Sequence, residues 1–163
     1  MKVTIKRLAL ADMDILLDWR MEVLAHVFAQ ERQDMTETAW QALREENRRY
    51  YEQELSCGGH IACFAQADGQ LAGCGGICLY QEMPSPDNPS GKCGYLMNIY
   101  TREPFRHQGI AQKVCTWLIQ QGKSWGAEKI YLETSACGRG LYQSLGFKDM
   151  QDYLQLAEGD RMK

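Results

Sequence analysis

The segment 94–134 constrains the fold more than any other, because it reads in order as a strand, a turn, a helix and a second strand. Residues 94–100 carry bulky side chains that favour strands, and Pro104, which cannot donate to a sheet ladder, ends that pattern. From Ile110 apolar residues recur at helical spacing, and residues 129–134 again favour a strand. Two strands joined through a helix lie parallel with a right-handed crossover. We therefore expect a parallel strand pair inside a sheet that a helix covers.

The turn between this first strand and the helix is basic and contains glycine. Arg106 and His107 supply positive charge, Gly109 permits close approach of the backbone, and the small Ala111 follows. The first N–H groups of a helix have no intrahelical partner, and the helix dipole attracts anions to them. The turn therefore predicts a phosphate-binding site at the start of the helix.

The remaining segments supply shorter elements. They are a strand over 3–8, an amphipathic helix reaching Val27, a polar helix over roughly 36–55, a hairpin of 61–67 and 70–79, an exposed loop over 81–92, a short helix over 141–145, and one or two strands within 147–156. Asp68-Gly69 is a strong hairpin signal, and Asp34, three residues before Glu37, predicts the start of the polar helix. The glycines within 73–76 predict a bulge or close backbone packing. An antiparallel hairpin beside a parallel crossover gives a mixed sheet with flanking helices, so the expected fold class is α+β in a single domain over 1–163.

Composition excludes several classes of function. The 163 residues include 18 Lys and Arg against 21 Asp and Glu, a net charge of −3, which argues against a nucleic-acid partner. Seven cysteines without a Cys-x-x-Cys pair argue against a metal cluster and indicate reduced thiols, hence a cytoplasmic setting. No apolar run approaches membrane-spanning length, so no membrane partner is expected.

Two motifs make the chain resemble the GNAT (general N-acetyltransferase) superfamily. Arg106–Ala111 has the pattern Arg-x-x-Gly-x-Ala of the family's pyrophosphate-binding turn. Gly138–Phe147 is similar to the Gly-Arg-x-Leu-Tyr-x-x-x-Gly-Phe segment near the end of such enzymes. The motifs lie about 30 residues apart with a predicted strand between them, and the order of elements resembles the family over nearly the whole chain.

The resemblance implies acetyl-CoA as cosubstrate and a mostly antiparallel sheet in which a parallel pair, 96–100 and 130–134, is splayed. The pantetheine arm would lie in that opening, and the N–H groups of residues 108–111 would hold the pyrophosphate. The coenzyme-binding residues implied by position are Met97, Ile99, Tyr100, Arg106, His107, Gln108, Gly109, Ile110, Ala111 and Arg139. No metal is implied.

The resemblance also assigns catalytic roles. Tyr142 matches the tyrosine that family members use as general acid toward the departing thiolate, the alternative being that it only packs the short helix. A backbone N–H near Ile99 could polarise the thioester carbonyl. Glu133 is a candidate base acting through water; Glu82 and Glu103 are alternatives, and a structural or surface role is the plainer interpretation of all three.

Two further side chains have open roles. Asn98, which should point opposite to its strand neighbours, could bind the acceptor or serve packing or a bulge. Cys137 could carry an acyl group, although direct transfer fits better and a packed thiol is the simpler interpretation.

The expected function is therefore an acetyl-CoA-dependent N-acetyltransferase in which a primary amine of a small molecule or peptide attacks the thioester directly. A non-catalytic acyl-CoA sensor or partner-binding module on the same fold is the alternative. The acids Glu82 and Asp87 of the 81–92 loop could attract a cationic acceptor such as a polyamine. Similar proteins commonly pair through terminal strands, which leaves a homodimer open.

Overall fold

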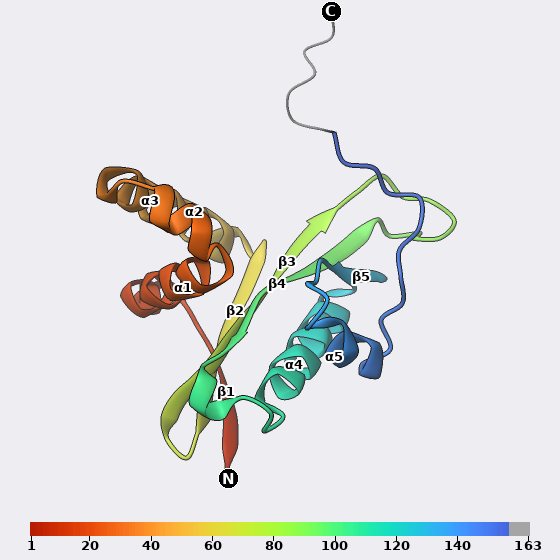
Figure 1. The fold of residues 1–163 in the computed structure, drawn as a ribbon. Helices are drawn as coiled ribbons and strands as arrows, with labels where there is room; N and C mark the ends of the chain where they lie inside the picture. The colour runs from red at the N-terminus through yellow and green to blue at the C-terminus, as the bar shows by residue number, and fades with distance from the viewer. Residues whose placement is uncertain (157–163) are drawn as a thin grey trace, which may run out of the picture. The chain divides into compact units, whose positions relative to one another are not determined.

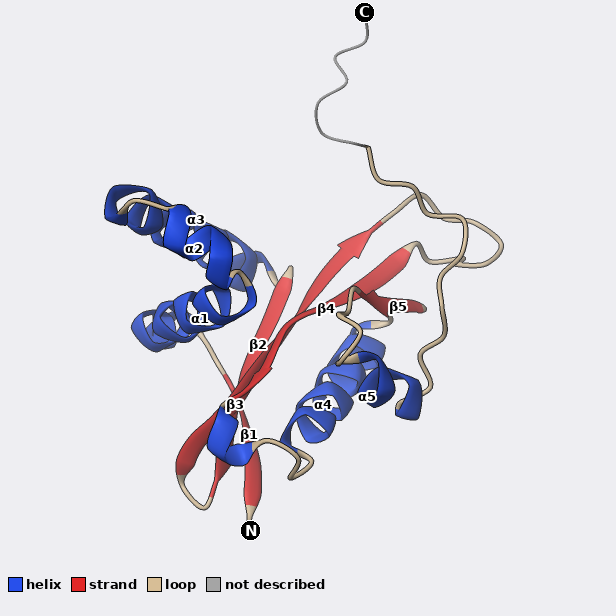
Figure 2. Ribbon diagram, viewed as in Figure 1, coloured by secondary structure: helices blue, strands red, loops and turns tan. Residues whose placement is uncertain are grey.

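A single five-stranded sheet organises the first of two compact units into which the chain divides, Met1–Glu133 and Thr134–Lys163. The structure is a computed structural model, and it describes residues 1–156. The strands are β1 (Val3–Arg7), β2 (His60–Ala67), β3 (Gln70–Gln81), β4 (Lys92–Thr101) and β5 (Lys129–Leu132), and they lie in that order across the sheet (Figure 2). Pairing is antiparallel from β1 to β4 and parallel between β4 and β5. The mixed sheet with a parallel pair is confirmed.

Helices cover both faces of this sheet (Figure 1). The helices are η1 (Leu10–Asp12), α1 (Met13–Val27), α2 (Ala29–Asp34), α3 (Glu37–Cys57), η2 (Glu103–Phe105) and α4 (Ile110–Trp125). Helices α1 and α3 lie against one face, where Trp19 of α1 packs on Phe64 of β2 at a ring separation of 5.1 Å. Helix α4, the crossover between β4 and β5, covers the other face. Within the described residues no helix is long and apolar enough to cross a membrane.

Local sequence signals account for most element boundaries. Asp68 and Gly69 both have positive φ, 48° and 84°, as a two-residue hairpin turn requires. Gly58 and Gly126, both left-handed, end α3 and α4. The predicted start of α3 at Asp34 is wrong, because Thr36 is the cap and its Oγ1 accepts from the N–H of Ala39.

The glycines of β3 let α4 lie directly on the sheet. A Cβ added at Gly75 would be 2.6 Å from Val114 and 2.9 Å from Leu118 of α4, and one added at Gly73 would be 3.0 Å from Ile110. These distances are too short for ordinary contacts, so a side chain at either position would push the helix outward. The close packing predicted for 73–76 is confirmed.

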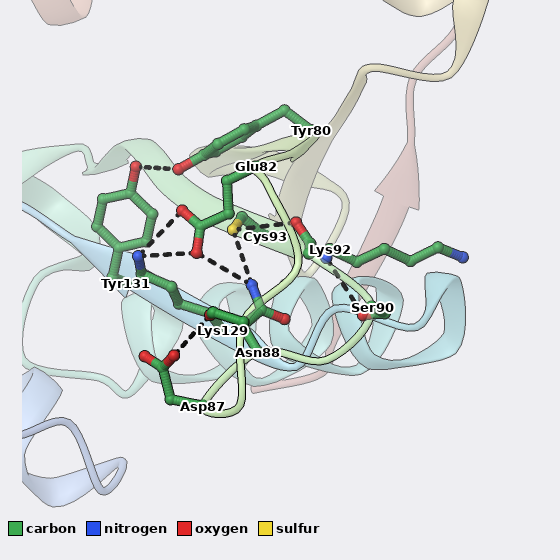
Figure 3. A network of polar contacts seen from close by, with 11 residues as sticks. Tyr80, Glu82, Asp87, Asn88, Ser90, Lys92, Cys93, Lys129 and Tyr131 are labelled. Carbon is green, nitrogen blue, oxygen red and sulfur yellow. Dashed lines mark hydrogen bonds and ion pairs between the residues drawn. The ribbon is translucent and has the colours of Figure 1, made fainter.

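The exposed loop expected between β3 and β4 is present, with Met83 and Asp87 exposed, and a buried residue within it anchors it to the sheet (Figure 3). Asn88 is fully buried, and its Nδ2 donates to Glu82 at 3.2 Å. Lys129 of β5 donates to both carboxylate oxygens of Glu82, at 3.2 and 3.1 Å. These bonds, with Asn88 first, hold the pKa of the Glu82 carboxyl below its ordinary value. Glu82 therefore links this segment to the sheet.

The second unit contains α5 (Arg139–Ser144), followed by Gly146 in a left-handed conformation as expected after a helix end. The ring of Tyr142 meets that of Phe147 edge-on at 6.0 Å. Between 147 and 156 the described chain contains no strand, so the predicted terminal strands are wrong for these residues. An alternating pattern makes a strand only when a neighbouring backbone accepts and donates its hydrogen bonds.

Candidate active site

A β-bulge in β4 lies at the centre of the candidate site. Gly76 pairs with Met97 and Cys74 with Tyr100, so Gly75 alone lies opposite both Asn98 and Ile99. Asn98 has φ of +57°, a conformation that asparagine adopts more readily than most residues. A bulge leaves one residue outside the regular ladder and redirects the side chains around it. Here it interrupts β4, the strand that pairs with β5.

Strand β4 also extends beyond its partner. The parallel pairing with β5 runs from Cys93↔Lys129 to Leu96↔Leu132 and stops there. Residues 97–101 therefore have no β5 residue in register with them. β5 itself ends at Leu132, so the bulge of β4 lies just beyond the last paired residue.

The turn before α4 covers residues 106–109 and follows β4 after the short helix η2. Gly109 is the N-cap of α4 with φ of +76°, no side chain caps the helix, and its first turn has no acidic residue. A Cβ added at Gly109 would have nothing within 4 Å, so the space above this helix start is open. His107 is also left-handed, at φ of 60°. The Nε2 of Gln108 donates to the carbonyl of Pro104 at 3.0 Å and closes the turn.

The arginines next to this turn are held in different ways. The Arg106 Nε donates to the carbonyl of Thr101 at 3.1 Å, and its Nη2 lies 3.2 Å from Nε2 of His26 in α1. Arg102 instead binds both oxygens of Glu22, at 3.0 and 2.7 Å, and stacks over Trp19. The charge of Arg102 is thereby offset, whereas Arg106 forms no ion pair with any residue in 1–156 and keeps its positive charge at the entrance to the turn.

A cavity of about 230 Å³ opens on the opposite side of the bulge, between the sheet and the helices α1 and α3. Its lining residues come from four elements: Arg20 of α1, Glu46, Asn47, Tyr50 and Tyr51 of α3, His60 of β2, and Met97 and Asn98 of β4. The bulge places Met97 and Asn98 on the same cavity. The expectation that Asn98 points away from its neighbours is therefore wrong, because the extra residue breaks the period-two alternation.

Hydrogen-bonded aromatic groups form part of the wall of this cavity. The hydroxyl of Tyr50 is bonded to Nδ1 of His60 at 2.9 Å and to the sulfur of Cys78 at 3.0 Å. Burial, with a smaller contribution from the charge of Arg20, lowers the pKa of His60 to about 4. His60 is therefore neutral at physiological pH. Burial raises the pKa of Tyr51 to about 12, so the phenol keeps its proton.

The other predicted residues of β4 and β5 are distributed over both faces. Ile99 lies on the α4 side, 2.8 Å from a Cβ added at Gly75, while Tyr100 packs against Trp19 and His26 of α1. Glu133 is exposed after the end of β5. Burial first, and then the charge of Glu133, raise the pKa of the Tyr95 phenol. Glu133 is absent from the cavity lining given above.

The second motif lies in the second unit. Tyr142 is half-buried in α5, and Arg139 forms an ion pair with Asp149. The ion pair raises the pKa of Arg139 and lowers that of Asp149. Cys137 is exposed, and its sulfur lies 3.1 Å from the hydroxyl of Ser135. No group of three or more His, Cys, Asp or Glu side chains in the described part of the chain could hold a metal ion.

Sequence reasoning missed most of the cavity, although one signal was present. Arg20 follows Leu16 by four positions and precedes Val23 by three, so a cation interrupts the apolar stripe of α1. Asn47 interrupts the stripe of α3 in the same way, between Leu43 and Tyr50. A polar residue at a core-facing position needs a partner, and these two are partners: Arg20 Nε donates to Asn47 Oδ1 at 3.0 Å.

The arrangement therefore offers two binding regions on opposite faces of one sheet. An open helix start with an arginine beside it suits a phosphorylated ligand on the α4 side. A small cavity with polar and aromatic walls suits a second molecule on the α1 and α3 side. In the β4 bulge, Ile99 lies on the α4 side and Asn98 lines the cavity on the other side. Groups bound on the two faces of the sheet can therefore meet at the bulge.

Comparison with known proteins shows the family of the chain. A model of the acetyltransferase (GNAT) family matches residues 24–147. An uncharacterized N-acetyltransferase of Escherichia coli (strain K12), YjgM, is 31% identical over 98 residues, which are 58% of this chain and 54% of that protein. The match thus spans about half the length of this relative.

Two more matches cover larger shares of the proteins concerned. The glucosamine 6-phosphate N-acetyltransferase of Arabidopsis thaliana is 25% identical over 108 residues, 64% of this chain and 70% of the relative. The crystal structure of a predicted acetyltransferase with acetyl-CoA from Clostridium acetobutylicum has the same fold, with a TM-score of 0.80 at 23% identity and 96% of each chain covered.

Proposed function

The chain belongs to the acetyltransferase (GNAT) family, and from that premise we propose that it is an N-acetyltransferase that moves the acetyl group of acetyl-CoA to a primary amine by direct attack of the amine on the thioester. The observation that carries the proposal is the β4 bulge at Asn98 and Ile99, which lies where the pairing with β5 has ended and leads within ten residues to the open start of α4. One strand thus serves both the donor and the acceptor regions.

The donor would bind on the α4 side. In this proposal the main-chain N–H groups of residues 108–111 bind the pyrophosphate, helped by the charge of Arg106 and by the dipole of α4. The stretch 97–101 of β4 would receive the pantetheine arm, because no β5 residue is in register with its backbone groups on that side. Met97, Ile99 and Tyr100 would then border the acetyl group.

The acceptor would enter from the cavity on the other face. The neutral amine nitrogen attacks the carbonyl carbon, a C–N bond forms, and the carbonyl oxygen becomes negative. A backbone N–H of the bulge near Ile99 would stabilise that oxygen, an effect typically worth about 3 kcal/mol. The C–S bond then breaks, and the electron pair leaves with the sulfur.

Two proton transfers complete the reaction. The departing thiolate takes a proton from the hydroxyl of Tyr142. The ordinary pKa of a tyrosine, about 10, lies close enough to that of a thiol, about 8.5, for such a transfer to cost only ~2 kcal/mol. The acetylated nitrogen loses its extra proton through water to a carboxylate, for which we propose Glu133. Glu82 is less suited, since Lys129 and Asn88 already bind its oxygens.

Turnover with a panel of amines tests this function. The purified protein is mixed with acetyl-CoA and each amine, and both free CoA and the acetylated amine are quantified by mass spectrometry. We expect equal amounts of the two products with at least one primary amine and no acetyl group retained on the protein. Acetylated Cys137 accumulating in single-turnover samples would contradict direct attack, and binding of acetyl-CoA without transfer to any amine would contradict the proposed activity.

The proposal also places the enzyme in the cytoplasm. All seven cysteines are free thiols, which fits the reducing cytoplasm. The proposal includes a possible homodimer, and light scattering would measure the oligomeric state.

A further inference from the structure

Arg20 places a positive charge in the wall of the acceptor cavity, where the lining carboxylate Glu46 is paired with Arg49 and not with Arg20. It is partly buried, and in the described part of the chain it forms no ion pair. Arg44 and Arg102, on neighbouring elements, pair instead with Asp18 and Glu22 at 2.7 Å. Partial burial of a cation is costly unless a charge or enough hydrogen bonds offset it.

The guanidinium of Arg20 is held in place by neutral groups alone. Its Nε donates to Asn47 Oδ1 at 3.0 Å and its Nη1 to Asn98 Oδ1 at 2.9 Å. Its Nη2 donates to no acceptor within residues 1–156. Two amide oxygens fix the plane of the guanidinium and leave its charge in place. This is how a residue is oriented to receive an anionic group.

The remaining charges of the cavity do not cancel that of Arg20. His60 is neutral, because burial depresses its pKa. Glu46 is exposed, and it already binds Arg49 at 2.6 Å on the surface of α3. Tyr50 and Tyr51 keep their protons, since burial raises the pKa of both phenols. The interior of the cavity therefore carries a net positive charge, which a simple cationic amine would not favour.

We propose that the acceptor is a small amine that also carries an oxyanion, a carboxylate or a phosphate, and that Arg20 binds this oxyanion. The inference rests on the proposed acetyl transfer. Asn98 is both the bulge residue and a partner of Arg20, so the oxyanion lies next to the place of transfer. The amine and the oxyanion must then be separated by only a few bonds. A cavity of about 230 Å³ fits a molecule of amino-acid size.

Matched pairs of acceptors test the inference. One arm compares amino acids with their amides, and the other compares O-phosphoethanolamine with ethanolamine. We expect kcat/KM to be about 10- to 100-fold higher for the acid-bearing member of one arm, the range of a hydrogen bond to a charged group. The arm in which the preference occurs identifies carboxylate or phosphate. Arg20→Gln should remove the preference mainly through KM, and Arg20→Lys should restore part of it.

Control measurements separate binding from folding. Arg44→Gln removes an arginine that lies outside the cavity, so it should leave the preference unchanged. Arg20→Gln should unfold at the same temperature as the wild type or higher, since it removes an unbalanced partly buried charge, and it should bind acetyl-CoA with unchanged affinity. A lowered melting temperature together with a retained preference would assign Arg20 a structural role and overturn the inference.

The outcomes for this inference and for acetyl transfer are distinct. Equal kcat/KM values within both pairs, or a preference that survives Arg20→Gln, would overturn the anionic acceptor while leaving the transfer activity standing. Absence of transfer to every amine, with acetyl-CoA bound, would overturn the activity and this inference with it.

Discussion

Asn98 adopts a left-handed backbone conformation in the middle of a strand, at φ of +57°, and its side chain accepts a hydrogen bond from Arg20. The backbone and the side chain thus have separate tasks, one in shaping β4 and one in the cavity. Substitutions can separate these tasks, because glycine adopts this conformation without strain whereas a β-branched residue does not.

Asn98→Gly should keep the bulge and change the free energy of unfolding by less than about 1 kcal/mol, whereas Asn98→Val should lower it by about 2 kcal/mol through backbone strain. Both variants lose the contact with Arg20, so both should lose affinity for the acceptor. Urea unfolding and acceptor KM measure the two effects. Equal stability of the two variants would show that the bulge does not depend on this conformation.

Tyr142→Phe should lower kcat by about 100-fold or more, the usual contribution of a general acid, without weakening the binding of acetyl-CoA. Tyr153→Phe, a tyrosine of the same unit, is the matched control and should leave kcat near the wild-type value. Unchanged turnover of Tyr142→Phe would exclude the acid role and leave Tyr142 as a packing residue beside Phe147.

The lowered pKa of His60 predicts that the protein loses stability in acid. Its pKa is about 4 in the folded protein and about 6.5 in the unfolded chain, so between these values only the unfolded state takes up a proton. Stability is therefore unaffected above pH 6.5 and falls as the pH drops toward 4, by up to about 3 kcal/mol. The groups facing His60 are Tyr50, Tyr51 and Arg20, with Cys78 bonded to Tyr50.

Comparing the wild type with His60→Gln isolates this effect. The carboxyls of Asp12, Glu22 and Asp149 also have lowered pKa values, and they destabilise both proteins alike as pH falls through those values. Urea unfolding at pH 7, 5.5 and 4.5 should give a steeper loss for the wild type. Parallel losses in the two proteins would mean that His60 takes up its proton in the folded state.

At the scale of elements, the contact between α4 and β3 depends on glycine. Gly75→Ala places a Cβ 2.6–2.9 Å from Val114, Ile99 and Leu118, and overpacking of this kind should cost about 1–3 kcal/mol. Gly140 in α5 has nothing within 4 Å of an added Cβ, so Gly140→Ala should instead stabilise its helix by up to about 1 kcal/mol. A Gly75→Ala protein as stable as the wild type would show that α4 can shift away from the sheet.

The same elements show which parts of the fold and of the candidate site could be predicted from the sequence alone. The Asp68-Gly69 hairpin, the α4 crossover and the glycine contacts follow from local propensity and spacing, and they are confirmed. The cavity is different, because Arg20, Asn47 and His60 come from three elements that only tertiary packing brings together. The wrong strands within 147–156 show the same limit, since a strand depends on a pairing partner that its own residues do not specify.

At the scale of the whole molecule, the sheet of residues 1–133 separates the two binding regions. Helix α4 and its open start lie on one face, and the cavity under α1 and α3 lies on the other. The β4 bulge has residues on both sides, so the proposed transfer takes place through the sheet at this point. Transfer at this point requires that the main chain at the start of α4 hold acetyl-CoA.

Titration of acetyl-CoA followed by calorimetry tests that requirement most directly, with the wild type compared with Gly109→Asp and with Gly69→Asp. Both glycines have positive φ and open space around them, but only Gly109 lies at the start of α4. A carboxylate there repels phosphate without disfavouring the helix. We predict binding to the wild type, equal binding to Gly69→Asp, and at least about tenfold weaker binding to Gly109→Asp, or about 1.4 kcal/mol. No heat with the wild type, or equal affinity of all three proteins, would contradict the account.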